Sequence, residues 1–427
     1  MKPEGKKRAW LWIPTAYFAE GGPFMAVSTV SAILFKSLGM EDRYVALWTS
    51  LMMLPWSIKP LWAPFVDMFR TKRQWILATQ LVMTLLFTAM AGLIVKESLS
   101  LILIGTFFLL AFASATHDVA VDGFYLIALD KHEQAFFAGI RGTFYRIASV
   151  SVQGGLVTLA GVVEHWNGNL RLGWALSLFC AAAAMGAVFL WHLFLLPRPA
   201  EDRTAKREVG ICSDFLSSFL SFFQMKGIVW ILLFLFLFRL AEAQLGKIAG
   251  LFLQSSPEQG GLGLSLEAIG TLYGTIGPLA LIAGGILGGM LVAARGFAKC
   301  IWPLVCAINL PDIVYVYLAV ERPASLWAVG GCIALEQFGY GLGYTAVLLV
   351  MVALAEKSGR FKTSHFAIMT GVTILGMMLI GGISGYVAEH LGYVGFFWYV
   401  MVCTIPSFLI TVPIVKLIPA EFGSKSA

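Results

Sequence analysis

Residues 101–129 read LILIGTFFLLAFASATHDVAVDGFYLIAL, and this stretch decides the class of fold. A helix needs about 20 apolar residues to cross a bilayer, and this run is longer than that. Within it, the only acidic or basic side chains are those of His117, Asp118 and Asp122. Such groups are costly at membrane depth and are usually functional, so they are the first candidates for a site.

The composition of the whole chain agrees with this interpretation. The protein has 427 residues, of which 59% are hydrophobic and 13% are charged, and its mean hydropathy is +0.81. A soluble domain carries roughly a quarter charged residues. The six cysteines are scattered without a CxxC pair, which argues against a zinc site or a disulfide framework. We therefore expect an integral membrane protein.

Hydrophobic runs separated by polar connections predict an all-α protein with twelve transmembrane helices. The runs are too long and too continuous for the strands of a β-barrel. They cover residues 10–36, 44–66, 75–95, 99–129, 136–163, 172–196, 227–253, 265–294, 300–320, 325–355, 363–388 and 393–416.

Basic residues orient these helices. With both termini in the cytoplasm, most of the 30 Lys and Arg residues lie in cytoplasmic connections, as the positive-inside rule requires. The net charge of +6 therefore indicates topology and not nucleic-acid binding. The opposite side carries only Lys36, Arg43, Lys96, Arg171 and Arg322.

A weak internal repeat divides the chain in two. GVVEHWN at 161–167 resembles GYVAEHLG at 385–392, and other matches recur at similar offsets. One long polar connection begins at 196. We expect two pseudo-symmetric six-helix bundles, 1–196 and 227–427, joined by a cytoplasmic linker at 197–226. Internal repeats of this kind are typical of transporters.

Away from the ends of the expected spans, charged residues occur on spans one, two, four, five, seven and ten, apart from Asp312 on span nine. With Asp312 set aside, the acidic and basic residues are equal in number. This equality favours ion pairs between them in a poorly solvated cavity. The acids are Glu20, Asp118, Asp122, Glu242 and Glu336, and the bases are Lys59, Arg141, Arg146, Arg239 and Lys247.

Asp118 and Asp122 are four residues apart and share one helix face. Two close carboxylates in such a cavity favour proton uptake, which suits a proton-coupled importer. The alternative is permanent pairing with Lys59, Arg141 or Arg146. His117 either relays a proton or hydrogen bonds to a neighbouring helix.

The bases are candidates for binding an anionic substrate. Arg141 and Arg146 offer planar forks that suit carboxylate or phosphate. Arg239 and Glu242 are three residues apart, so they can pair within one helix. Lys247 points to a different side of the same expected helix.

Three stretches resemble one group of transporters. WSIKPLWAPFVD at 56–67, HDVAVDGFYLIAL at 117–129 and LEQFGYGLGYTAVLLVMVALA at 335–355 are similar to segments of the AmpG-type muropeptide permeases and the related acetyl-CoA transporters. His117 stands where that group usually has glutamine. The resemblance implies the major facilitator superfamily fold, with two six-helix bundles.

It also implies a function. We expect a secondary transporter that imports anhydro-muropeptides, anionic glycopeptides, across the bacterial inner membrane by proton symport, with membrane lipid as its surroundings. We expect it to be monomeric and to need no cofactor or metal. The alternative substrates are a siderophore and acetyl-CoA. A membrane-embedded enzyme is a weaker alternative, because neither HExxH nor GxSxG occurs.

The expected site has three parts. Proton coupling involves Asp118, Asp122, His117, Glu20 and Glu242. A cytoplasmic charge cluster of Asp67, Arg70, Lys72 and Arg73 resembles the superfamily's gating loop, although the basic residues also satisfy topology alone. Substrate binding involves Lys59, Arg141, Arg146, Arg239, Lys247, Glu336, Gln337, Tyr340 and Tyr344.

Overall fold

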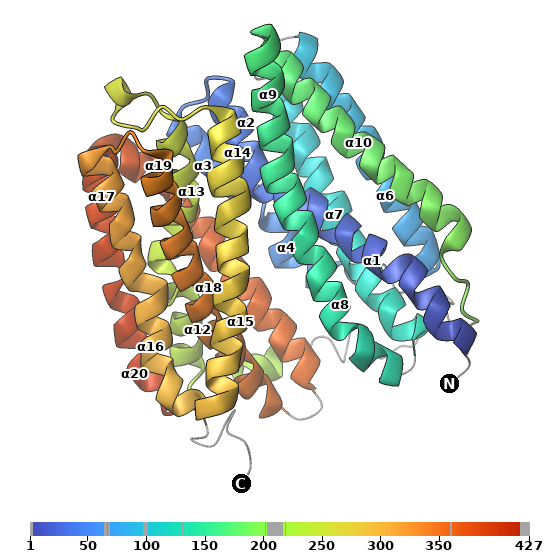
Figure 1. The fold of residues 1–427 in the computed structure, drawn as a ribbon. Helices are drawn as coiled ribbons and strands as arrows, with labels where there is room; N and C mark the ends of the chain where they lie inside the picture. The colour runs from blue at the N-terminus through green and yellow to red at the C-terminus, as the bar shows by residue number, and fades with distance from the viewer. Residues whose placement is uncertain are drawn as a thin grey trace. The chain divides into compact units, whose positions relative to one another are not determined.

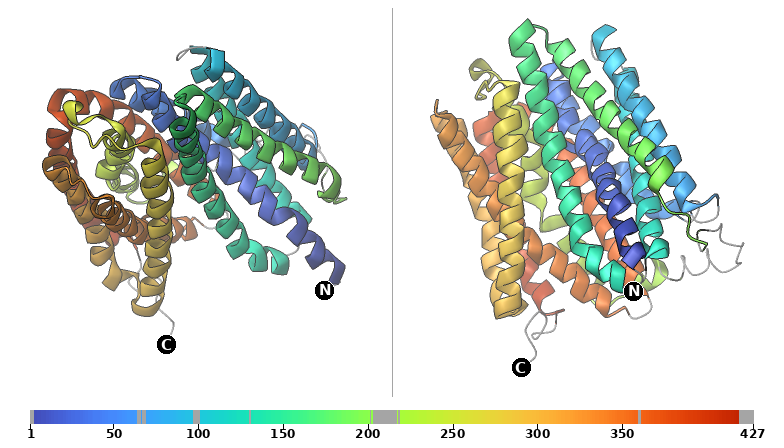
Figure 2. Two further views of the ribbon diagram at one scale, coloured as in Figure 1. Left: turned by 45° about the horizontal axis from the view of Figure 1, so that its top comes forward. Right: turned by 45° about the vertical axis from the view of Figure 1, so that its right-hand side comes forward.

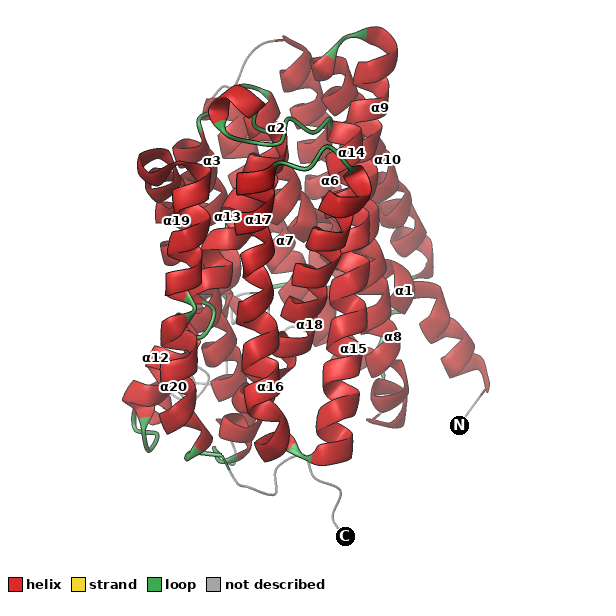
Figure 3. Cartoon of the chain, turned by 60° about the vertical axis from the view of Figure 1, so that its left-hand side comes forward, coloured by secondary structure: helices red, strands yellow, loops and turns green. Residues whose placement is uncertain are grey.

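The computed structural model describes residues 3–63, 66, 69–96, 101–129, 131–200, 202, 217, 219–358 and 361–418. Within these residues every regular element is helical (Figure 3). Ten helices in the described part are long and apolar enough to cross a membrane. The prediction of an all-α, multi-pass membrane protein is therefore confirmed.

The chain divides into two compact units (Figure 1). Unit 1 comprises Met1–Met40 and Ile58–Glu208, and unit 2 comprises Glu41–Ser57 and Val209–Ala427. The segment 41–57 therefore packs with the second unit, although most of unit 1 follows it in the sequence. The expected division at 197–226 places this segment in the first bundle.

Unit 1 consists mainly of long helices that pack against one another. Helix α1 packs against α8, and α6 packs against both α7 and α10 (Figure 2). Trp12 of α1 meets Phe124 of α7 edge-to-face, with ring centroids 5.1 Å apart, in the buried core. The elements are α1 (Pro3–Met25), η1 (Ala26–Val30), α2 (Ser31–Ser37), η2 (Lys59–Leu61), α6 (Lys72–Lys96), α7 (Leu101–Ala128), α8 (Lys131–Val150), η3 (Ser151–Leu156), α9 (Val157–Asn167) and α10 (Leu170–Leu195).

Unit 2 is organised around α18, which packs against α15 and α16. Glycine allows this approach: a Cβ on Gly341 would lie 2.0 Å from the carbonyl oxygen of Leu281. The elements are α3 (Asp42–Leu51), α4 (Leu54–Ile58), α12 (Ile228–Leu237), α13 (Leu240–Gln254), η4 (Pro257–Gln259), α14 (Leu266–Thr271), η5 (Leu272–Ile276), α15 (Gly277–Arg295), α16 (Phe297–Asn309), η6 (Leu310–Asp312), α17 (Ile313–Glu321), α18 (Leu326–Glu356), α19 (Lys362–Cys403) and α20 (Ile405–Val415).

Helix α3 is anchored on α19. Tyr393 donates a hydrogen bond to Asp42, and Arg43 Nη1 lies 3.3 Å from Glu389 Oε1. The backbones are equally close, because a Cβ on Gly385 would lie 2.5 Å from the Cα of Arg43. These contacts explain why 41–57 belongs to unit 2.

One expected span differs from the helices observed. The run 44–66 is not one continuous helix: α3 ends at Leu51, α4 follows, and η2 is a 3-10 turn that contains Pro60. Proline removes a backbone donor and interrupts a helix. Element α19 contains two helices that meet at a kink. Gly392, whose backbone is non-helical (φ 65°, ψ 168°), separates them, and it lies between the expected runs 363–388 and 393–416.

Several helices are irregular at membrane depth. Elements η1, η3 and η5 are π-helical turns that continue α1, α8 and α14. The span at 228–254 is interrupted between α12 and α13, where Arg239 has non-helical dihedral angles. Such irregular turns are frequent at functional sites.

Candidate transport site

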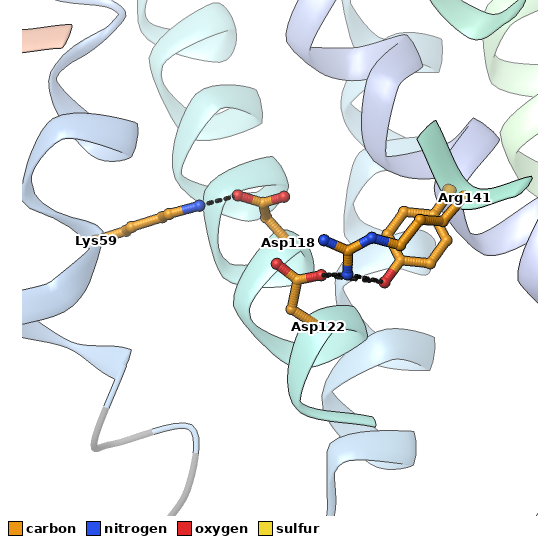
Figure 4. Close-up of polar contacts among 5 residues, drawn as sticks. Lys59, Asp118, Asp122 and Arg141 are labelled. Carbon is orange, nitrogen blue, oxygen red and sulfur yellow. Dashed lines mark hydrogen bonds and ion pairs between the residues drawn. The ribbon is translucent and has the colours of Figure 1, made fainter. Parts of the chain in front are cut away.

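Two ion pairs lie on one face of α7. Asp118 Oδ2 pairs with the Nζ of Lys59, which belongs to η2 (Figure 4). One turn further along, Asp122 Oδ1 lies 3.2 Å from Nη1 of Arg141, which belongs to α8. The two carboxyls therefore bind different bases from different elements.

Tyr17 of α1 completes the second pair. Its hydroxyl donates to Asp122 Oδ1 at 3.0 Å and accepts from Arg141 Nη1 at 3.2 Å. The guanidinium also lies over the rings of Tyr17 and Tyr125, at 5.3 and 5.2 Å from their centroids. Hydrogen bonds and ring contacts together orient the fork of Arg141.

Glu20 adds a third acid to this cluster. Its carboxyl interacts with those of Asp118 and Asp122, and its Oε2 is buried without a hydrogen-bond partner among the described residues. Three acids therefore share two bases, Lys59 and Arg141. Glu20 Oε2 and Asp118 are buried, and an uncompensated charge there is costly, so this part of the cluster favours binding a proton.

His117 lies in a separate hydrogen-bonded chain. Its Nε2 is 3.0 Å from Nε2 of Gln80 on α6, and Gln80 is 2.8 Å from Nδ1 of His192 on α10. His192 Nε2 continues to Thr15 Oγ1 on α1 at 2.9 Å. His117 thus makes the neighbouring-helix hydrogen bond that was one of its two predicted roles, and a proton relay stays a prediction.

Unit 2 contains a second charged cluster, at the break between α12 and α13. Arg239 Nη2 lies 2.8 Å from Glu242 Oε2, which is the predicted pairing within one helix. Arg239 also donates to the hydroxyl of Tyr340 and lies over the ring of Tyr344, 4.9 Å from its centroid. This part of the predicted substrate-binding set is therefore brought together.

The other predicted residues of unit 2 have local partners. Gln337 Nε2 donates to both carboxyl oxygens of Glu336, at 3.3 and 3.0 Å. Lys247 Nζ lies 3.3 Å from Thr49 Oγ1 of α3. Glu336 is 3% exposed, so its carboxyl is enclosed.

The predicted gating residues surround the start of α6. The backbone amides of Lys72 and Arg73 donate to the carboxylate of Asp202, at 2.8 and 3.1 Å. A carboxylate at a helix N-terminus accepts otherwise unpaired amides and complements the helix dipole. Arg70 has a left-handed backbone, with φ 68°. Asp67 lies outside the described residues, and the gating role of this cluster stays a prediction.

Arg146 does not join these clusters. It lies on α8 five residues after Arg141, and its side chain is exposed. Five residues correspond to roughly 500° of rotation on an α-helix, which turns Arg146 well away from Arg141. Its substrate-binding role stays a prediction.

Several members of these networks were not predicted from the sequence, among them Tyr17, His192 and Asp202. Counting only acids, lysines and arginines passes over Tyr17 and His192. One available signal was the spacing of Tyr17, which lies three residues before Glu20 on the same helix face. No comparable signal pointed to Asp202, because it lies in the polar connection.

Comparisons with known proteins identify the class of protein. The BT1 family profile matches residues 22–139. An anhydromuropeptide permease of Escherichia coli K12 is 24% identical, over 91% of this chain and 74% of that protein. A Rickettsia conorii protein named as transporter AmpG 4 is 25% identical, over 91% of this chain and 92% of its own length. The chain is a membrane transporter. It is not an enzyme, and the predicted resemblance to AmpG-type permeases is confirmed.

Solved structures give the transporter's fold. The nucleoside transporter NupG superposes with a TM-score of 0.68, covering 98% of this chain and 99% of that chain at 15% identity. A POT family transporter in complex with 5-aminolevulinic acid gives a TM-score of 0.69, covering 97% of both chains at 12% identity. This likeness concerns the fold of the transporter and not its substrate.

Proposed function

We propose that the protein is a secondary active transporter that imports anhydro-muropeptides by proton-coupled alternating access. The observation that carries this proposal is the cluster between α1 and α7, where three acids share two bases. The name of the Escherichia coli relative supports the substrate class. We further propose twelve helices in two pseudo-symmetric bundles, a monomeric state, and a bacterial inner membrane location with both termini in the cytoplasm.

The two ion pairs differ in how easily they exchange partners. The side chains of Arg141 and Asp122 are 41% and 48% exposed, whereas those of Lys59 and Asp118 are 32% and 11% exposed. A solvated pair contributes only about 0–1 kcal/mol, so water or a ligand can replace one partner at little cost. Arg141 and Asp122 are therefore the pair that opens first.

Asp122 and a substrate carboxylate compete for Arg141, and this competition couples proton binding to substrate binding. When Asp122 takes up a proton, it loses its attraction for the guanidinium, and Arg141 becomes available to a substrate carboxylate. A muropeptide supplies such carboxylates, and the planar fork of arginine binds them in two-point contact. Loss of the proton on the other side of the membrane restores the Asp122–Arg141 pair and displaces the substrate.

Uptake into proteoliposomes tests the proposal. An acid exterior should drive accumulation of labelled GlcNAc–anhydroMurNAc peptide, and a protonophore should abolish it. Asp122→Asn should lose gradient-driven accumulation but keep substrate counterflow, because asparagine cannot exchange a proton. Glu258→Gln, at an exposed acid of η4, is the matched control and should behave as the wild type.

Two outcomes contradict the proposal in different ways. Uptake of a siderophore or acetyl-CoA in place of the glycopeptide would overturn the substrate. Unchanged pH dependence of uptake in Asp122→Asn would assign Asp122 a structural role only.

A further inference from the structure

The acids and bases in the interior of unit 2 do not balance. Arg239 is bound to Glu242, and Lys247 is bound to Thr49. Glu336 and Asp312 remain, and they are 3% and 2% exposed. No cation is among the groups that act on either carboxyl in the described part of the chain.

Close helix packing brings these two carboxyls into one region. A Cβ on Gly339 of α18 would lie 2.7 Å from Cγ of Pro311 in η6. Glu336 lies one turn before Gly339, and Asp312 directly follows Pro311. Accordingly, the carboxyl of Glu336 acts electrostatically on that of Asp312, and the carboxyl of Glu242 does so less strongly.

Two buried polar atoms at this position lack a hydrogen-bond partner among the described residues. They are Oδ2 of Asp312 and the hydroxyl oxygen of Tyr315. Tyr315 lies three residues after Asp312, so both occupy one face of the same helical stretch. The hydroxyl of Tyr315 is within electrostatic range of Asp312, Glu336 and Tyr273. Buried polar atoms without partners are rare and point to a ligand or a bound proton.

Among the residues that the structure describes, no positive charge compensates the pair. Element η6 packs against α16, α17, α18 and α19. The titratable groups that act on the pair or on Tyr315 are Glu242, Tyr273 and Cys332, all of which are neutral or negative. Two ionised carboxylates would repel each other here without a counterion.

We infer that Asp312 and Glu336 form a second proton-binding site, located in unit 2. At least one of the two carboxyls carries a proton, which neutralises the pair and provides an O–H donor for the neighbouring oxygens. Release of that proton to water leaves a carboxylate that unit 2 can accommodate only after water or a cation reaches it. The role of this exchange in transport rests on the proposed proton coupling, whereas the presence of the proton does not.

Infrared spectroscopy of the purified full-length protein tests the site without any substrate. The wild type should show the carbonyl stretch of a protonated carboxylic acid, and this band should fall as the pH is raised. Asp312→Asn and Glu336→Gln should each lose the band or shift its pH midpoint. If Asp312→Asn does not fold, Glu336→Gln reports on the same pair. Glu258→Gln, an exposed acid, should leave the band unchanged.

Three results would overturn the inference. A band that neither variant alters would place the proton elsewhere. A band that persists at every pH at which the protein stays folded would mean a permanently neutral, structural pair. Loss of the band on addition of sodium at constant pH would identify a metal-cation site. None of these measurements involves muropeptide uptake, so the inference and the proposed function can fail separately.

Discussion

Lys59→Met tests how strongly the Lys59–Asp118 pair stabilises unit 1. Methionine keeps most of the length of lysine but removes its charge, and it leaves the carboxylate of Asp118, 11% exposed, without its cation. Removing one partner of a buried pair costs about 3–5 kcal/mol. We expect the lower end, about 3 kcal/mol of the free energy of unfolding, because Lys59 is itself 32% exposed.

A second substitution separates the charge effect from lost packing. The double variant Lys59→Met/Asp118→Asn carries no charge at either position. Replacing both partners of a buried ion pair with uncharged residues often changes the free energy of unfolding little. The double variant should therefore lie within about 1 kcal/mol of the wild type. The four proteins of this double-mutant cycle, unfolded by denaturant in detergent micelles, give the coupling energy directly.

The control for this experiment is Lys96→Met. Lys96 is exposed at the end of α6, and surface substitutions of this kind change stability by about 0.5 kcal/mol or less. The reasoning is refuted if Lys59→Met and the double variant are destabilised equally. Stability would then depend on the lysine side chain itself and not on its charge pairing with Asp118.

Two further predictions concern packing. Gly385→Ala should cost about 1–3 kcal/mol, because the new methyl would overlap the backbone at Arg43, whereas Gly289→Ala on α15 meets nothing within 4 Å and should not destabilise. Equal melting temperatures of the two glycine variants would contradict this packing. His117→Gln should keep both stability and uptake, while His117→Leu should cost about 1–3 kcal/mol by removing one of the two histidine partners of the buried Gln80 amide. A folded His117→Gln protein without gradient-driven uptake would instead assign the imidazole a proton-transfer role.

Local features of the site were predictable from the sequence. The length of its apolar run located α7, and the four-residue spacing placed Asp118 and Asp122 on one face. The three-residue spacing predicted the Arg239–Glu242 pair in the same way. These predictions succeed because helix geometry relates residues that are close in the chain.

Partners from distant helices were harder to predict. The sequence offers both Arg141 and Arg146 of α8 as partners for the acids of α7. Among the described residues, it is Arg141 that binds Asp122. That choice depends on the rotation of α8 about its axis, which is set by its packing against α1 and by Tyr17. The membership of 41–57 in unit 2 likewise depends on how α3 packs against α19, a contact with residues more than 300 positions away.

Asp312 shows why a count of acidic and basic residues over the whole chain conceals a local excess of acids. Five acids and five bases balance only when Asp312 is omitted and when all ten are assumed to meet. In the structure Arg146 is exposed and Lys247 binds a hydroxyl, so neither neutralises an acid. Each unit then has more buried acids than bases at its centre, although the chain carries a net charge of +6. The positive-inside rule expects the net positive charge in the polar connections. The acid excess among the described residues lies inside, where a bound proton neutralises a carboxyl.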